Sequence, residues 1–195
     1  MTTEAPIKKH TLLKSLAPIA VILIAVMLGL GLIKKFVVGP PRLGTATADL
    51  DLKVGGTIPD FTLNKFGDHA SVQASTLSSK VVLVNFWASW CEACMVEMPS
   101  IVKLRESFKA KGFEVVSVNV DENPEKAVPP LTKKFKMEFP VYVDTDQKLS
   151  ELFDIHAIPL TVIMDKNRKI LFMDSGERDW DGSDMIKMLD GWLAG

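Results

Sequence analysis

Val81-Val-Leu-Val-Asn-Phe-Trp-Ala-Ser-Trp-Cys-Glu-Ala-Cys-Met-Val-Glu-Met-Pro99 is the stretch of this sequence that decides the fold. It opens with four consecutive aliphatic residues, 81–84, and such a run is typical of a strand that is buried on both faces of a sheet. Downstream of the cysteines, apolar residues recur at helical spacing, as Leu104 and Phe108 do. The stretch therefore predicts a buried strand that runs directly into a helix.

The two cysteines of the chain, Cys91 and Cys94, lie where this strand meets the helix. A helix places residues three apart on one face, so the two sulfur atoms are expected within bonding distance. Cys91 falls at the N-terminus of the helix, where free backbone N–H groups and the macrodipole favour a thiolate over a thiol. A stabilised thiolate with a second thiol beside it is what an attack on disulfide bonds requires.

The composition is that of an ordinary globular protein with one membrane-like addition. The chain has 195 residues, of which 47% are hydrophobic and 24% are charged, and its formal net charge is -1. Residues 1–50 carry six Lys and Arg against two acids, whereas residues 51–195 carry 17 against 22. A mildly acidic globular part without a basic stripe argues against nucleic acid as a partner.

The N-terminal part of the chain predicts a membrane anchor. Residues 16–33 form an uncharged apolar run, which as a helix spans about 27 Å and is long enough for a hydrocarbon core. Lysines flank the run on both sides, and the following residues to 38 can extend it. The expected organisation is a short cytoplasmic tail over 1–15, a transmembrane signal anchor over 16–38, a linker over 39–54 and a globular domain over 55–195.

Two alternatives to a retained anchor stay open. Ala46-Thr-Ala48 resembles a signal-peptidase site, although it lies well past the apolar run and beyond Lys34 and Lys35. A buried soluble helix is disfavoured because the run has no polar face. The flanking lysines are balanced, so the positive-inside rule does not choose an orientation. Redox chemistry favours a domain on the extracytoplasmic side, because disulfides persist in oxidising compartments.

Strand-like and helix-like segments alternate along residues 55–195, and they predict an α/β fold of three layers. The helix after the cysteines is expected to run to about Lys111 and to end at Gly112, with a kink where Pro99 removes a helical N–H. The other predicted elements are a hairpin over 58–73, strands over 113–120, 139–143, 160–164 and 169–173, and helices over 125–136, 149–153 and 185–193.

Several motifs of this domain occur in the order found in a known family. They are Pro59-Asp-Phe-Thr-Leu63, Asn85-Phe-Trp-Ala-Ser-Trp-Cys-x-x-Cys94, Glu97-x-Pro99 and Ala157-Ile-Pro159. Together they resemble the membrane-anchored thioredoxin-like proteins of the TlpA/ResA/CcmG (DsbE-like) family. The resemblance implies a thioredoxin fold, with a central mixed β-sheet flanked by helices, an N-terminal β-hairpin extension and one transmembrane helix before it.

The resemblance also implies roles for individual residues. Cys91 would be the nucleophile and Cys94 the buried resolving thiol. Pro159 would be a cis-proline packed against the disulfide, and Ile158 before it would offer its backbone to a bound substrate strand. Glu97 matches an acidic residue of this family, and a carboxylate one helical turn beyond the second cysteine can take that thiol's proton.

Four neighbours of the cysteines refine this picture. Asn85 is neutral where thioredoxin has an aspartate, which moves the expected proton transfer to Glu97. Glu92 places a negative charge beside the first cysteine, so it should disfavour the thiolate and shift the couple toward reduction. Ala93 stands where many relatives have a proline that shapes the turn. Trp90 is expected at the rim of the site, where aromatic side chains contact substrate.

These residues also have simpler interpretations. Half of a zinc site would need further ligands, and only His10, His69 and His156 are candidates, so no metal is expected. A passive structural disulfide is disfavoured by the position of the pair at a helix start. Glu97 has an alternative as a solvated helix residue, and Pro159 as an ordinary proline at a strand entry.

The expected activity is thiol–disulfide exchange, with the Cys91–Cys94 disulfide in place of a bound cofactor. The resemblance implies exported protein disulfides as substrates, apocytochrome c among them, and a transmembrane dithiol donor of the CcdA or DsbD kind. It implies a single-pass protein of the cytoplasmic or inner membrane, with its domain on the periplasmic or extracytoplasmic side. A thiol peroxidase stays open, because the upstream hairpin also resembles peroxiredoxin-like proteins, as does a non-catalytic client-binding assembly protein.

Overall fold

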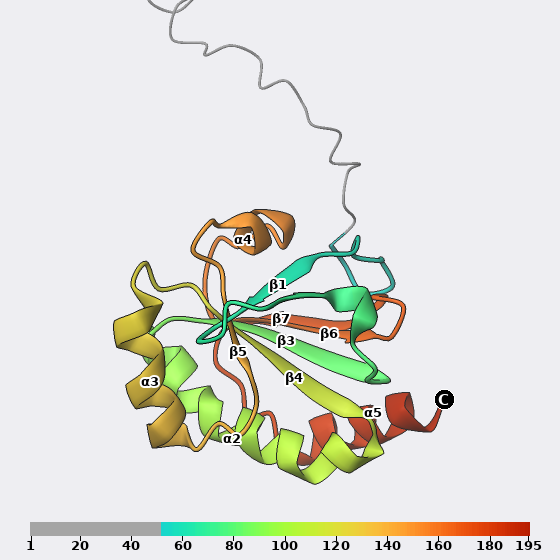
Figure 1. The fold of residues 1–195 in the computed structure, drawn as a ribbon. Helices are drawn as coiled ribbons and strands as arrows, with labels where there is room; N and C mark the ends of the chain where they lie inside the picture. Colours follow the sequence, from blue (N-terminus) through green and yellow to red (C-terminus); the bar gives the residue numbers. More distant parts are fainter. Residues whose placement is uncertain (1–51) are drawn as a thin grey trace, which may run out of the picture. The chain divides into compact units, whose positions relative to one another are not determined.

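A mixed sheet of seven strands forms the centre of residues 52–195, the part of the chain that the computed structural model describes (Figure 1). The strand order is β2-β1-β5-β4-β3-β6-β7. The three central pairings differ in direction, because β3 runs parallel to β4 and antiparallel to β6, while β4 runs parallel to β5. The strands are β1 (Thr62–Lys65), β2 (Ser71–Gln73), β3 (Val81–Trp87), β4 (Phe113–Asn119), β5 (Val141–Val143), β6 (Leu160–Asp165) and β7 (Ile170–Ser175).

The central strand β3 is buried along its whole length, which explains its aliphatic sequence. Successive side chains of a strand point to opposite faces of the sheet. Leu83 and Trp87 accordingly pack into one hydrophobic cluster, and Val84 and Phe86 pack into a second cluster on the other face. Asn85 has the same parity as Leu83 and Trp87, so the sheet directs this polar side chain toward the first cluster.

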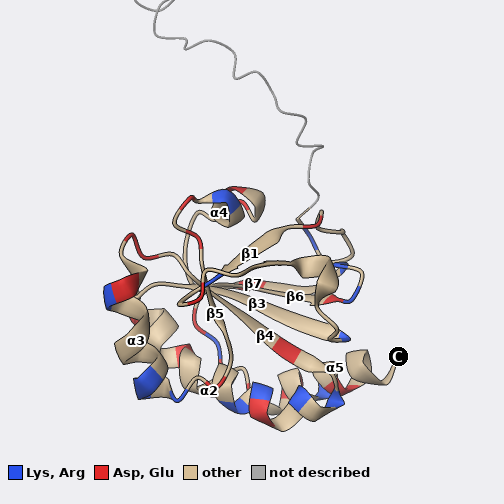
Figure 2. Ribbon diagram, in the orientation of Figure 1, with Lys and Arg blue, Asp and Glu red and all other residues tan. Residues whose placement is uncertain are grey.

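Helices cover both faces of the sheet and complete the three predicted layers. The helix α2 (Glu92–Phe108), α3 (Pro124–Phe135) and α5 (Ser183–Ala194) contribute to the cluster around Trp87, and α4 (Lys148–Leu152) contributes to the other. Figure 1 shows α4 on the opposite side of the sheet from α2 and α5. Charged residues lie mainly on helices and loops, whereas β3 carries none (Figure 2). The predicted α/β fold with a mixed sheet is confirmed.

The helix after the cysteines continues through Pro99, because α2 is one helix of 17 residues. Pro99 removes its own N–H from the helical pattern, and packing holds the rest of this long helix. The predicted kink at Pro99 stays a prediction. The end is as predicted: a short turn, η2 (Lys109–Lys111), is followed by Gly112 in the left-handed region at φ 94°.

The predicted N-terminal hairpin is present as β1 and β2, with Thr62 opposite Gln73. It leads through a short turn, η1 (Ala74–Thr76), into β3. The hairpin extends the main sheet because β1 also pairs with β5, where Asn64 lies opposite Val143. The predicted strand over 139–143 is shorter than expected and begins at Val141, directly after Pro140, which has no N–H to donate.

The predictions for the tail over 1–15, the anchor over 16–38 and most of the linker over 39–54 lie outside the described residues. Among residues 52–195, no helix has both the length and the apolar character needed to cross a membrane. The predicted anchor and the domain boundary at 55 therefore stay predictions.

Candidate active site

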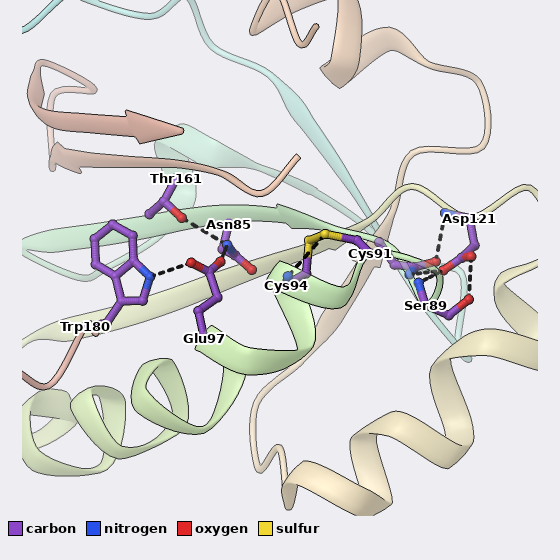
Figure 3. The surroundings of a disulfide bond; sticks show 9 residues. Asn85, Ser89, Cys91, Cys94, Glu97, Asp121, Thr161 and Trp180 are labelled. Carbon is purple, nitrogen blue, oxygen red and sulfur yellow. Dashed lines mark hydrogen bonds between the residues drawn. A yellow bond between two sulfur atoms is a disulfide. The ribbon is translucent and has the colours of Figure 1, made fainter. Parts of the chain in front are cut away.

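Cys91 and Cys94 form a disulfide at the start of α2, with their Cα atoms 5.3 Å apart (Figure 3). Cys91 is the N-cap of the helix, and the backbone N–H of Cys94 donates to its Sγ at 3.1 Å. Cys91 is 7% exposed and Cys94 is 0% exposed. The outer sulfur therefore lies where backbone N–H groups stabilise negative charge, and the inner sulfur lies in the core.

A buried carboxylate holds the loop that leads from β3 into the cysteines. Asp121, just beyond the end of β4, accepts from the backbone N–H of Ser89 at 2.8 Å and from its hydroxyl at 2.7 Å. Asn119 donates to the same carboxylate at 2.7 Å. Trp90 follows in this loop with 71% of its surface exposed, and its role in substrate contact stays a prediction. The loop is thus fixed at Ser89 and presents an indole to solvent beside Cys91.

A hollow of about 800 Å³ adjoins the exposed indole. It lies between the loop of Trp90, the segment that joins β4 to α3, and α3 itself, so residues far apart in the sequence share its wall. Both polar and apolar side chains line it, as at sites that take polypeptide segments. The lining residues are Ser89, Trp90, Val120, Asp121, Glu122, Asn123, Lys126, Ala127, Pro130, Leu131 and Gln147.

Glu97 lies one helical turn beyond Cys94 and is 1% exposed, so its interpretation as a solvated helix residue is wrong. Asn85 Nδ2 donates to its Oε1 at 2.8 Å, and Trp180 Nε1 donates to its Oε2 at 2.9 Å (Figure 3). The Asn85 amide also donates to Thr161 Oγ1 at 2.9 Å. Both carboxylate oxygens are therefore held by donors from the sheet and from the loop before α5.

Burial raises the pKa of the Glu97 carboxyl above its usual value of 4.5, because loss of water disfavours the charged form. The hydrogen bonds from Trp180 and Asn85 act in the opposite direction and offset only part of the rise, and the charge of Asp174 adds to it. A carboxyl with a raised pKa holds a proton more readily than an ordinary glutamate and can take one from a donor and return it. The predicted transfer between Glu97 and the Cys94 thiol is chemically reasonable and stays a prediction.

The peptide bond between Ile158 and Pro159 is cis, as the resemblance implied. Ile158 packs against the hydrophobic cluster that contains both cysteines, and the Pro159 carbonyl accepts from the N–H of Gly176 at 2.9 Å. Pro159 directly precedes β6, the strand beside β3. The structure thus brings this segment to the cluster of the disulfide, while its contact with substrate stays a prediction.

The two residues between the cysteines differ in exposure. Glu92 is exposed in the first turn of α2, where a carboxylate also interacts favourably with the helix macrodipole. Ala93 is half-buried and packs against the cluster of the cysteines.

Among residues 52–195, no group of three or more His, Cys, Asp or Glu side chains is arranged to hold a metal ion.

Three contributors to the site were missed by sequence reasoning. Trp180 and Thr161 hold the Glu97 and Asn85 pair, and Asp121 holds the cysteine loop. The only local signal was at Asp121, because polar residues that follow parallel strands gather at one edge of a sheet. Trp180 lies in an irregular segment with no periodic pattern, so nothing in the sequence connects it with Glu97.

Comparisons with known proteins agree with this geometry. A family model described as Redoxin matches residues 53–189. The thiol-disulfide oxidoreductase ResA of Oceanobacillus iheyensis is 33% identical over 144 residues, which cover 72% of this chain and 71% of that protein. ResA of Bacillus subtilis is 33% identical over 122 residues, or 63% of this chain and 67% of that one. A Chlorobium tepidum crystal structure, assigned as the thiol:disulfide interchange protein DsbE, superposes with a TM-score of 0.64 at 29% identity, covering 72% and 98% of the two chains.

Proposed function

The chain belongs to the Redoxin family and is a thiol–disulfide oxidoreductase of the ResA and DsbE type, and from this we propose that it reduces disulfide bonds in exported client proteins. The observation that carries the proposal is the unequal placement of the two sulfur atoms. Cys91 caps α2 and keeps 7% of its surface exposed, whereas Cys94, one helical turn further on, has 0% exposed. This arrangement suits one attacking thiolate and one resolving thiol.

The reaction is a two-electron exchange between the dithiol and the client disulfide. The Cys91 thiolate attacks one client sulfur, so a mixed disulfide forms and the client S–S bond breaks, and the leaving client thiolate takes a proton. Cys94 then loses its proton to Glu97 and attacks the Cys91 sulfur. The Cys91–Cys94 disulfide forms, and the second client sulfur leaves as a thiolate. The client has gained two electrons and the enzyme has lost them.

The direction of this exchange depends on the charge near Cys91. Strong oxidants of this kind stabilise their thiolate, which makes the reduced form favourable. Glu92 acts against that stabilisation, because a carboxylate in the first turn of α2 repels the thiolate at the N-cap. The backbone N–H of Cys94 still supports the thiolate enough for attack. The repulsion from Glu92 against the support from the backbone N–H favours reduction of the client. Ala93, in place of a proline, also affects the shape of the turn between the two cysteines.

Client recognition is proposed at the exposed rim of the site. Trp90 and the adjoining hollow offer apolar and polar contacts beside Cys91, and Ile158 packs against the cluster that contains both cysteines. Apocytochrome c, with its pair of haem-binding cysteines, is the proposed client. Electrons would return from a transmembrane dithiol carrier of the CcdA or DsbD kind. The chain would be tethered by residues 16–38, with this domain on the extracytoplasmic side of the cytoplasmic or inner membrane.

Replacement of Cys94 by Ala tests the proposal directly. The full-length variant should accumulate client proteins in a disulfide with Cys91, because the resolving attack is removed, and the trapped proteins should carry export signals and pairs of cysteines. The measurement is mass spectrometry of proteins released from the purified variant by reductant.

The double variant Cys91→Ser/Cys94→Ala is the control and should trap nothing. Recovery of no partner from the single variant would count against client reduction. Recovery of cytosolic partners alone would contradict the proposed location. Peroxide consumption that disappears in Cys91→Ser would instead support the thiol peroxidase.

A further inference from the structure

The amide nitrogen of Asn85 has hydrogen-bond partners in the protein, whereas its amide oxygen has none. Asn85 is 1% exposed, and its Nδ2 donates both of its hydrogens, one to Glu97 Oε1 and one to Thr161 Oγ1. Its Oδ1 is the one buried side-chain oxygen or nitrogen among residues 52–195 without a hydrogen-bond partner in the protein. A buried acceptor without a donor is destabilising, so its place here calls for a physical reason.

The orientation of this amide follows from its neighbours. An ionised Glu97 can only accept hydrogen bonds, so the nitrogen of Asn85 must face it and the oxygen must face away. In Figure 3 the free oxygen of Asn85 points toward Cys94, and Glu97 and Trp180 lie on its other side. Cys94 and Glu97 are one helical turn apart on the same face of α2, so an amide bonded to Glu97 lies beside Cys94 as well.

We infer that Asn85 Oδ1 accepts a hydrogen bond from the Cys94 thiol in the reduced protein, which makes Asn85 a positioning residue for the resolving cysteine. The inference rests on the dithiol chemistry of Cys91 and Cys94 and not on the identity of the client. In the disulfide Cys94 has no S–H to donate, which accounts for the unpartnered oxygen. On reduction the thiol gains its hydrogen, and the acceptor is already in place.

Such a contact separates the roles of the two thiols. An acceptor stabilises the neutral thiol, so it raises the pKa of Cys94, whereas the backbone N–H at Cys91 Sγ stabilises a thiolate there. Cys94 then stays protonated until a mixed disulfide has formed on Cys91. The amide itself neither gives nor takes a proton. Because Nδ2 holds Glu97 Oε1, one side chain positions both the thiol and the carboxyl that is proposed to take its proton.

The charged groups around this thiol are few. Glu97 lies on its own helix, and Asp174 of β7 acts on Glu97 while it forms an ion pair with Arg178 at 2.7 Å. The Arg178 backbone N–H also acts on Glu97, and Cys91 lies at the helix start. Loss of the Asn85 side chain removes the acceptor of Cys94 and also one donor of Glu97. The loss of this donor raises the pKa of Glu97 further, so Glu97 carries less negative charge near the thiol. The loss of the acceptor and the loss of the donor therefore both lower the pKa of Cys94.

Asn85→Leu tests the inference because it keeps the approximate volume and removes both halves of the amide. The measurement is the Cys94 thiol pKa in the full-length Cys91→Ser background, from the pH dependence of alkylation. We expect Asn85→Leu to lower this pKa by about one unit, which is about tenfold more thiolate at a given pH below the pKa. The S–H stretching band of Cys94 should also move to higher frequency, because a free S–H bond is stiffer than one that donates.

Two further variants keep the test decisive if Asn85→Leu folds poorly. Asn85→Asp retains an oxygen that faces Cys94, so the thiol pKa should stay at or above that of the parent. Thr161→Val removes the other partner of Nδ2 and leaves Oδ1 in place, so it should leave the S–H band unchanged. A fall of the Cys94 pKa in Asn85→Asp, an unchanged S–H band in Asn85→Leu, or an equal change in Thr161→Val would overturn the inference.

Discussion

At the scale of single residues, Glu97 is a buried acid whose ionisation works against folding. Its folded-state pKa is raised, so the native protein binds this proton more tightly than the unfolded chain does. The stabilisation from Glu97 is complete below the unfolded pKa near 4.5 and is lost as pH rises through the folded pKa. Glu97→Gln, which does not ionise, should therefore gain stability relative to wild type as pH rises above about 4.5, by about 1.4 kcal/mol for each unit of pKa difference.

Denaturant unfolding of the two oxidised full-length proteins at several pH values measures this effect. The oxidised form is used because its cysteines do not titrate. A Gln side chain can keep both contacts, because its oxygen accepts from Trp180 while its nitrogen donates to a turned Asn85 amide. Trp180→Phe, which retains the carboxyl, serves as control and should keep a pH-dependent stability. A constant difference between wild type and Glu97→Gln over these pH values would contradict the raised pKa.

The sequence predicted some of these residues and could not have predicted others. The cysteine pair was accessible because its geometry is local, set by a spacing of three at a helix start. The cis bond at Pro159 was predicted from the resemblance and is confirmed. The surroundings of Glu97 depend on tertiary packing, since Trp180 lies 83 residues further along the chain. Asn85 was dismissed as neutral, yet its amide is bonded to the carboxylate.

At the scale of elements, the connection between β3 and α2 depends on Asp121. This carboxylate is 7% exposed and accepts from both donors of Ser89 and from the buried amide of Asn119, so Asp121→Ala leaves these donors without their acceptor. We expect it to lower the free energy of unfolding by about 2–3 kcal/mol. Hydrogen exchange at the amides of Ser89, Trp90 and Cys91 should accelerate as well, because the loop loses its anchor.

Asp144→Ala is a matched control for this prediction. Asp144 is also buried, and its carboxylate accepts from the N–H groups of Leu149 and Ser150 and from the Ser150 hydroxyl in the first turn of α4. Its loss should cost a similar free energy while hydrogen exchange in the cysteine loop stays as in wild type. Equally faster hydrogen exchange of that loop in both variants would show that the loop responds to a general loss of stability. Asp121 would then not be a specific anchor of the loop.

The elements themselves were predicted with errors confined mainly to prolines and ends. Apolar runs and helical spacing identified β3 and α2, because a buried strand and a long amphipathic helix carry strong patterns. Prolines lie inside both helices. Pro99 does not end α2, and Pro124 lies in the first turn of α3, one residue before the predicted start. Local rules for proline do not include the packing that holds a helix together.

At the scale of the whole molecule, strand order was beyond sequence reasoning. Alternating strands and helices indicate parallel neighbours, as β3 and β4 are, but they do not tell which edge the N-terminal hairpin joins. Its pairing with β5 makes the hairpin part of the main sheet. Both hydrophobic clusters consequently extend over the sheet, with the cysteines in one of them. The redox state of that pair is therefore coupled to the stability of the entire domain.

This coupling gives the last prediction. For a reductase, the folded chain must favour the Cys91–Cys94 disulfide more than the unfolded chain does, so the oxidised protein should be the more stable form. Urea unfolding of the oxidised and the reduced full-length protein measures the difference, which amounts to about 1.4 kcal/mol for every 30 mV between the folded and unfolded couples. Cys91→Ser/Cys94→Ser should show no effect of reductant. A reduced form that is the more stable one would mark the protein as an oxidant, and the proposed direction of electron flow would be wrong while its exchange chemistry would stand.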